Sequence, residues 1–304
     1  MNDLRALLGD AVYVIAFAWG ALWGSFMNVV IARMPTGESV VRPRSRCPGC
    51  RAPIAWFDNI PIVSWVLLRG KCRRCRAPIS IRYPIVELLV ALVTVSIVMR
   101  FGVSARGGVA WLFAFSLLAL SFIDLKHWII PDALSLPLIP LGLLAASFGV
   151  TVPFWEALIG AAAGSGVLLL VGFVYYLARG GSGMGLGDVK LLGGIGAMLG
   201  WKALPFVVFA ASLQGLVATL VLMVAGKKVV VPPMEGEGEE TGAGADAGAG
   251  ADAGRRDSFL DASPVEGKRA VPFGPFLSLA ALEVLFFADT LLRDLIKLVF
   301  PFLS

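Results

Sequence analysis

The chain has 304 residues, of which 58% are hydrophobic and only 15% are charged, with a formal net charge of +5. Ordinary soluble domains carry about 25% charged residues, and a soluble chain with so few could not cover its surface. This composition excludes a soluble dehydrogenase-like enzyme and a nucleic-acid-binding domain. It predicts an all-α polytopic membrane protein.

Apolar runs long enough to cross a hydrocarbon core, about 20 residues, recur along the whole sequence. The first run follows Asp3 and Asp10 and lacks a small-residue cleavage site, which favours a retained helix over a signal peptide. The shorter Gly-rich run Val189–Gly200 is either a tilted, partly re-entrant helix or continues into the next run through Trp201 and Lys202. About eight transmembrane helices are expected, over Ala11–Ile31, Pro84–Phe101, Val109–Ile123, Ala133–Val150, Phe154–Ala178, Val189–Gly200, Leu204–Ala225 and Phe273–Leu292.

The basic residues predict the orientation of these helices. Loops on one side of the predicted bundle hold 20 of the 26 Lys and Arg residues, and residues 32–83 alone hold 11. Because cytoplasmic loops are enriched in Lys and Arg, this side is expected to face the cytoplasm, with both termini in the periplasm. The chain then divides into a first transmembrane helix (residues 1–31), a cytoplasmic loop domain (residues 32–83) and a membrane domain (residues 84–304).

Four cysteines in the loop domain form two C-x-x-C pairs, Cys47 with Cys50 and Cys72 with Cys75. Two such pairs suit a tetrahedral four-thiolate zinc site, and the neighbouring arginines would stabilise the thiolates. The alternatives are two disulfides, which a reducing cytosol disfavours, or four unligated thiols. Since four protein ligands leave no open position, one structural zinc ion per chain is expected, and it would help this small domain to fold.

Two aspartates, Asp124 and Asp188, are expected at the cytoplasmic ends of predicted helices although they lie 64 positions apart. Ionisable groups at the membrane are costly and are functional candidates by default. A carboxylate pair can hydrolyse a peptide when the ionised partner activates water and the protonated partner donates a hydrogen bond to the scissile carbonyl. Glycines before Asp188 would let an extended substrate strand approach the backbone; they are Gly180, Gly181, Gly183, Gly185 and Gly187.

Each acidic residue also has a purely structural interpretation. Asp188 can be the N-cap of its helix, and Asp132, after Pro131, can be the N-cap of the following one. Asp124 can be a solvated charge at a helix end, paired with Lys126. The glycine-rich run before Asp188 is similar to a dinucleotide-binding loop, but it follows a membrane helix and not a strand, so that function is rejected. Residue chemistry alone leaves the catalytic and structural interpretations open.

The stretch Met234–Gly254 is acidic, rich in Gly and Ala, and without aromatic residues. Such a segment cannot bury enough apolar surface to offset the entropy of the chain, so a disordered loop is expected. Docking of a basic partner is the alternative function for this loop.

Seven strings of residues, in order along most of the chain, resemble the type IV prepilin peptidases, which are bifunctional leader peptidase/N-methyltransferases of bacterial inner membranes. The strings contain both cysteine pairs and both aspartates. They are GSFMNVVIARMP (24–35), RSRCPGC (44–50), NIPIVSWVLLRGKCRRC (59–75), ISIRYPIVELL (79–89), FIDLKHWIIPDALSLPL (122–138), GMGLGDVKLL (183–192) and VPFGPFLSLA (271–280).

This resemblance implies that Asp124 and Asp188 are the catalytic pair of a GxGD-type aspartic peptidase at the cytoplasmic face of the inner membrane. The implied substrates are prepilins and pseudopilins of type IV pilus and type II secretion systems, cleaved after a glycine. Neighbouring residues of the two aspartate motifs are expected to support the pair; they are Asp132, Gly185, Gly187 and Lys190. The sequence makes no prediction about self-association.

The resemblance also implies that the new N-terminal residue is methylated with S-adenosylmethionine as the donor. In the family this activity is associated with the N-terminal cytoplasmic region, which here is the four-cysteine loop domain. Glu87 lies in the matching motif and is the candidate residue for methyl transfer. Its structural alternative is a buried charge paired with an arginine such as Arg82.

Two further classes of function remain for comparison. A non-enzymatic zinc-bearing scaffold of a pilus or secretion assembly would explain the cysteines but would leave the two aspartates without a role. A transporter is disfavoured, because most predicted spans have no charged residue deep within them.

Overall fold

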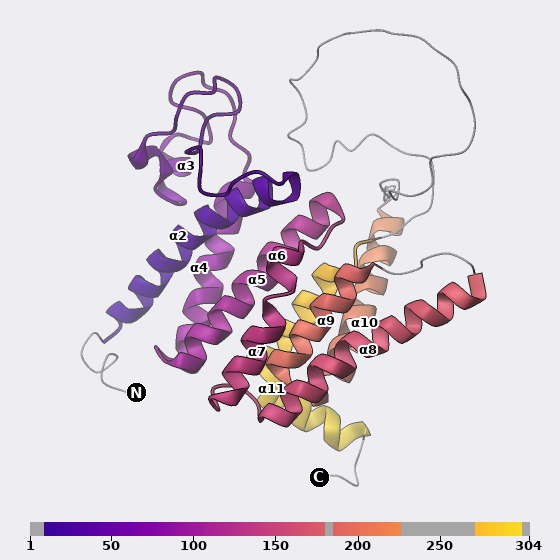
Figure 1. The fold of residues 1–304 in the computed structure, drawn as a ribbon. Coiled ribbons are helices and arrows are strands. Elements are labelled where there is room, and N and C mark those ends of the chain that lie inside the picture. Colours follow the sequence, from indigo (N-terminus) through magenta and orange to yellow (C-terminus); the bar gives the residue numbers. More distant parts are fainter. Residues whose placement is uncertain (1–8, 180–184, 226–270, 300–304) are drawn as a thin grey trace, which may run out of the picture.

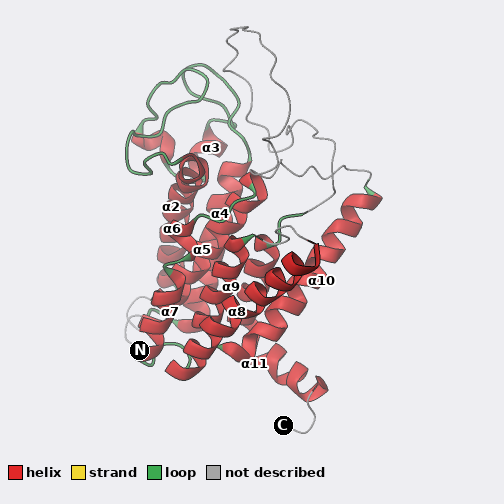
Figure 2. Cartoon of the chain, turned by 45° about the vertical axis from the view of Figure 1, so that its right-hand side comes forward, coloured by secondary structure: helices red, strands yellow, loops and turns green. Residues whose placement is uncertain are grey.

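The computed structural model describes residues 9–179, 185–225 and 271–299. They form a bundle of helices with an irregular loop domain at one end (Figure 1). Figure 2 shows the same division, with helices throughout the bundle and mostly loops and turns in the loop domain. Within the described ranges, β pairing is limited to two isolated bridges, and the predicted helical class is confirmed.

The helices of the bundle correspond to the expected apolar runs. The loop domain contains one short helix, α3 (Val63–Leu67), and the 3-10 turns η1 (Met34–Thr36) and η2 (Trp56–Asn59). The bundle helices are α2 (Ala11–Arg33), α4 (Arg82–Phe101), α5 (Ala105–His127), α6 (Asp132–Ser135), α7 (Leu138–Ser147), α8 (Phe154–Arg179), α9 (Leu186–Leu199), α10 (Leu204–Val224) and α11 (Gly274–Val299).

Two predicted helices differ from expectation. The run over residues 133–150 forms two helices, α6 and α7, because Pro137 between them has no amide hydrogen to donate. The Gly-rich run begins earlier than expected, at Leu186, and remains separate from α10. Gly200 adopts a φ of 82°, and the 3-10 turn η3 (Trp201–Ala203) lies between the two helices.

Five helices in the described part of the chain are long and apolar enough to cross a membrane, by length and composition. They correspond to the segments Ala11–Thr36, Arg82–Phe101, Ala105–His127, Phe154–Val174 and Trp201–Val224. The α6–α7 segment, α9 and the described apolar part of α11 are shorter. The chain is therefore a multi-pass membrane protein, whereas the total of eight spans stays a prediction.

The short helix α9 lies inside the bundle and contacts α7, α8 and α11. Its residues from Val189 to Met198, Lys190 excepted, are buried. Glycines make this close packing possible: a Cβ added to Gly142 of α7 would lie 2.7 Å from the backbone of Ala197, and one added to Gly160 of α8 would overlap the backbone of Gly196. The helix that carries Asp188 is thus fixed by backbone contacts on two sides.

Some predictions concern parts of the chain outside the described residues. These parts include the acidic stretch Met234–Gly254 and three of the glycines before Asp188, namely Gly180, Gly181 and Gly183.

Candidate active site and metal centre

The structure brings Asp124 and Asp188 together from distant parts of the sequence. Asp124 lies in the last turn of α5 and is 5% exposed, and Asp188 lies in the first turn of α9 and is half-buried. The two carboxylates are near enough to interact electrostatically. Both helix ends are at the end of the bundle that carries the loop domain (Figure 1). The burial of Asp124 contradicts the interpretation of a solvated helix-end charge.

The start of α11 completes the surroundings of Asp124. The Gly274 backbone lies against the Asp124 carboxylate, and its amide interacts favourably with the negative charge. Gly274 is the first residue of α11, where backbone amides have no partner within the helix and the helix dipole favours a negative charge. A Cβ on Gly274 would lie 2.5 Å from Oδ2 of Asp124, so only glycine leaves this carboxylate in place.

Ile130 forms an apolar wall beside the two acids. A Cβ added to Gly187 would lie 2.8 Å from Cβ of Ile130, and one added to Gly274 would lie 3.0 Å from its Cδ1. Ile130 and Gly274 were not among the site residues predicted from the sequence. Each lies in a string that carries the family resemblance, but only the fold brings these two strings to the aspartates.

The capping interpretations of two aspartates are wrong. The N-cap of α9 is Gly185, with Asp188 three residues later, and the N-cap of α6 is Pro131, so that Asp132 is the first helical residue. Asp132 instead forms an ion pair with Lys190, whose Nζ donates to both carboxylate oxygens, at 2.7 Å to Oδ1 and 2.9 Å to Oδ2. This pair joins α6 to the helix that carries Asp188.

Glu87 is buried in the second turn of α4, on a different element from the aspartate pair. Its Oε2 accepts a hydrogen bond from the amide of Ile62 at 2.7 Å, and the Ser25 side chain lies near the same carboxylate. Ile62 adopts a φ of 63° in a γ-turn closed by the Val63 amide and the Pro61 carbonyl (2.6 Å), a strained conformation for a β-branched residue. The alternative of an ion pair with Arg82 does not hold, since no ion pair joins Glu87 to Arg82 among the described residues.

The four cysteines converge in the loop domain. Their sulfur atoms all lie within 4.8 Å of one another, and the Sγ atoms of Cys47 and Cys75 are 3.7 Å apart. A zinc ion with four bonds of about 2.3 Å to sulfur needs sulfur atoms about 3.8 Å apart, so the thiols fit a tetrahedral ion. All four cysteines are free, which contradicts the alternative of two disulfides.

An internal repeat builds the two halves of this cluster. Residues 46–54 read RCPGCRAPI and residues 71–79 read KCRRCRAPI. In each copy the first cysteine amide donates to an alanine carbonyl, from Cys47 to Ala52 and from Cys72 to Ala77, at 2.9 Å. The arginine after the second cysteine, Arg51 or Arg76, has a positive φ in both copies. The cysteine spacing alone predicts the four ligands, and the repeated letters around them are a further sequence signal for two similar halves.

The thiols of the second copy differ in their acidity. Backbone hydrogen bonds, first from Cys75 and then from Arg74, lower the pKa of Cys72 to about 6. A hydrogen bond from the Ala77 backbone lowers the pKa of Cys75, but desolvation and the neighbouring thiols outweigh it and raise this pKa to about 11. Thiolates crowded in this way repel one another, and a bound cation would relieve that repulsion.

Comparison with known proteins gives consistent matches along the chain. Residues 18–101 match the bacterial peptidase A24 N-terminal domain, and residues 111–220 match the type IV leader peptidase family. A prepilin leader peptidase/N-methyltransferase of Myxococcus xanthus is 35% identical over 97% of this chain and 96% of its own length. Proteins of the same description from Neisseria gonorrhoeae and Klebsiella pneumoniae are 43% and 41% identical, over 74% and 70% of this chain and 87% and 99% of their own lengths. No solved structure matches the chain.

Proposed function

This chain belongs to the type IV leader peptidase family and is a peptidase with N-methyltransferase activity, and we propose that it removes the leader of prepilins and pseudopilins with Asp124 and Asp188. One observation carries this assignment of residues: two acids 64 positions apart approach each other at one end of the bundle. The cleavage follows a glycine at the cytoplasmic face of the inner membrane, where a basic leader stays in the cytosol.

The chemistry follows from the two carboxylates acting as a unit. Two such groups at close range favour a state with one shared proton, because two adjacent negative charges repel. The ionised group takes a proton from water as the water attacks the scissile carbonyl carbon, and the protonated group donates a hydrogen bond to the carbonyl oxygen. When the tetrahedral intermediate collapses, the carbon–nitrogen bond breaks and the leaving nitrogen receives the proton that was taken from water, so the pair returns to its state with one proton. The Gly274 amide holds Asp124 in position, and the Asp132–Lys190 pair steadies the start of α9.

Methyl transfer to the new N-terminus is proposed to involve Glu87. S-adenosylmethionine, when bound, would supply the methyl group. A buried carboxylate near the loop domain suits a positively charged amine. Asn28 of α2 offers a second acceptor: its amide donates to the carbonyl of Tyr83, one turn before Glu87 in α4, and its Oδ1 has no partner although Asn28 is only 3% exposed. Glu87 would orient the amine and take up the proton that it loses on methylation.

The whole proposal is tested by mass spectrometry of a pilin expressed together with this chain. The mature pilin should lack its leader and should carry one added methyl group on its first residue. A pilin that keeps its leader would contradict the peptidase assignment, and a trimmed but unmethylated pilin would contradict only the methyl-transfer half.

We expect Glu87→Gln to lower N-methylation about 100-fold, the range of a lost general base, and to leave leader cleavage within about threefold of the wild type. The same pilin peptide, analysed by mass spectrometry, reports both activities. Glu38→Gln, at an exposed position of the loop domain, is the matched control and should change neither activity. If cleavage falls in step with methylation, Glu87 supports the fold and does not take part in methyl transfer.

We expect Gly274→Ala to lower leader cleavage by about tenfold or more. The new Cβ can be accommodated only if the Asp124 carboxylate moves, and misplacement by about 1 Å is enough to cost orders of magnitude in rate. The protein should still fold, because the atom that must move is the end of a side chain. Gly166→Ala in α8 is the control, since a Cβ there meets nothing within 4 Å. Equal activities of the two variants would contradict the role given to Gly274.

A further inference from the structure

The short helix α3 is fixed beside the first turns of α4. The Ile62 amide, directly before α3, bonds to Glu87, the sixth residue of α4. Because α4 is one of the candidate spans and starts at Arg82, the start of α3 lies roughly 7 Å along α4 from its first residue. Ser64 holds the helix from the inside, since its hydroxyl donates to the Phe57 carbonyl and accepts from the Ile60 amide.

The other face of α3 exposes apolar side chains. Val63, Val66 and Leu67 lie on one helix face and are 49%, 60% and 76% exposed, whereas Ser64 is buried. A helix at a protein surface normally turns its apolar face to the core. At the depth of α4's first turns, this reversed arrangement suits contact with lipid chains.

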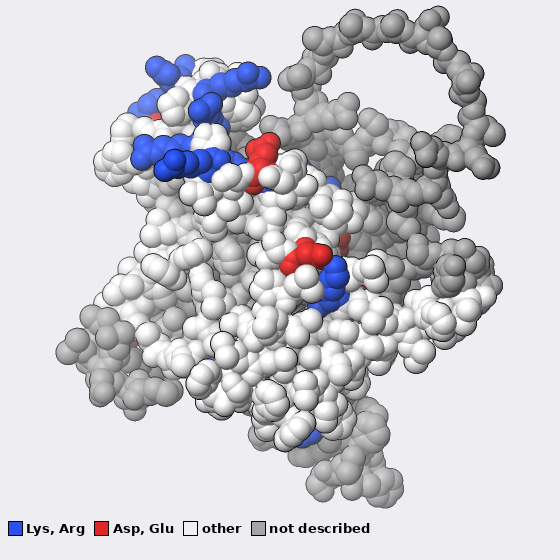
Figure 3. Space-filling model, in the orientation of Figure 1, with Lys and Arg blue, Asp and Glu red and all other residues white. Residues whose placement is uncertain are grey.

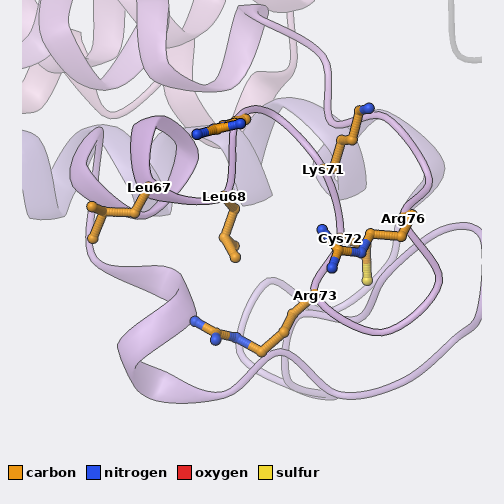
Figure 4. A pocket seen from close by; sticks show the side chains of 7 residues that line it. Leu67, Leu68, Lys71, Cys72, Arg73 and Arg76 are labelled. Carbon is orange, nitrogen blue, oxygen red and sulfur yellow. The ribbon is translucent and has the colours of Figure 1, made fainter.

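A cationic cavity of about 340 Å³ opens directly beyond this apolar face. It is lined by Leu67 and Leu68, by Cys72 of the four-cysteine cluster, and by four basic residues, Arg69, Lys71, Arg73 and Arg76 (Figure 4). Arg73 is already engaged, with a two-pronged ion pair to Asp58. The other three form no ion pair with any described residue, and no carboxylate lines the cavity. Figure 3 shows that Lys and Arg gather on this loop domain.

We propose that α3 and this cavity bind an anionic phospholipid of the adjacent leaflet. The phosphate of the headgroup lies among Arg69, Lys71 and Arg76, and the acyl chains lie against Val63, Val66 and Leu67. Basic side chains beside an apolar helix face are the pattern that recognises an anionic membrane surface, and a free phosphate would leave the apolar face unused. The site would hold the loop domain on the bilayer, and it does not depend on the catalytic roles proposed above.

The internal repeat supplies a matched test of the charges. Lys71→Gln/Arg76→Gln removes two charges beside the cavity, and Arg46→Gln/Arg51→Gln removes two charges at the equivalent positions of the other copy. Full-length protein is first placed in nanodiscs of phosphatidylcholine with phosphatidylglycerol. It is then transferred to mild detergent, and the phosphatidylglycerol molecules that stay bound are counted by native mass spectrometry. The cavity variant should bind phosphatidylglycerol about tenfold more weakly than wild type, and the control variant should be unchanged.

A second pair of variants tests the apolar face without risk to folding. Leu67→Gln should weaken retention of phosphatidylglycerol, whereas Val41→Gln should not, although the two side chains are 76% and 77% exposed. Equal losses within either matched pair would overturn the proposal. So would full displacement of the lipid by inorganic phosphate at a comparable concentration, because a phosphate site alone would then account for the binding.

Discussion

Replacing Asp124 or Asp188 with asparagine is expected to lower leader cleavage by about 1,000-fold or more. Asparagine keeps the shape of the side chain but cannot hold or release the proton that the pair shares. Since the two carboxylates act as one unit, the double variant should be no less active than either single variant. Timed digestion of a prepilin by purified protein, followed on a gel or by mass spectrometry, measures the loss.

Glu283→Gln provides the control for these variants. Glu283 is a partly buried carboxyl group of α11 that accepts a hydrogen bond from Gln214 at 2.9 Å, and it lies away from the aspartate pair. The Glu283→Gln protein should cleave prepilin at nearly the wild-type rate. Near-normal cleavage by either aspartate variant would refute the assigned pair.

The same double variant separates the enzyme from the scaffold hypothesis. In a strain that lacks its own leader peptidase, a scaffold without catalytic function would restore pili even with both aspartates replaced. We expect no pili from the double variant and normal pili from the wild-type chain, with both proteins present in the membrane at equal levels.

The helices could be predicted from the sequence because apolar runs directly reflect contact with lipid. The ends of the helices were harder to predict. Glycines near residue 185 hide the start of α9, whose helical form depends on packing against α7 and α8, and Pro137 divides a run that hydropathy alone treats as continuous.

The aspartates and cysteines could be predicted from the sequence because charge at a membrane and C-x-x-C spacing are both local patterns. The residues that contact them could not be predicted. The contacts of Gly274 with Asp124 and of Ile62 with Glu87 join residues 150 and 25 positions apart, and no local pattern encodes them. The interpretation of Asp132 as a cap failed for the same reason, since its partner Lys190 comes from another helix.

Purified protein is expected to contain about one zinc ion per chain, and loss of any one cysteine ligand should loosen the whole loop domain. A closed four-thiolate site depends on every ligand, and binding of structural zinc contributes about 10 kcal/mol or more to folding in small domains. Cys47→Ser and Cys50→Ser should therefore raise the rate of proteolysis within residues 32–83 to a similar degree, about tenfold or more. Leader cleavage should change far less, because the aspartates lie on other elements.

The two cysteines make a sharp comparison because their burial differs. Cys47 is 6% exposed, whereas Cys50 is an exposed residue. If the thiols held no metal, replacing Cys50 with serine would be nearly neutral and only Cys47 would matter for packing. Equal sensitivity of the two positions, together with loss of zinc by elemental analysis, therefore requires a shared ion, whereas resistance of the Cys50→Ser protein to proteolysis would exclude it.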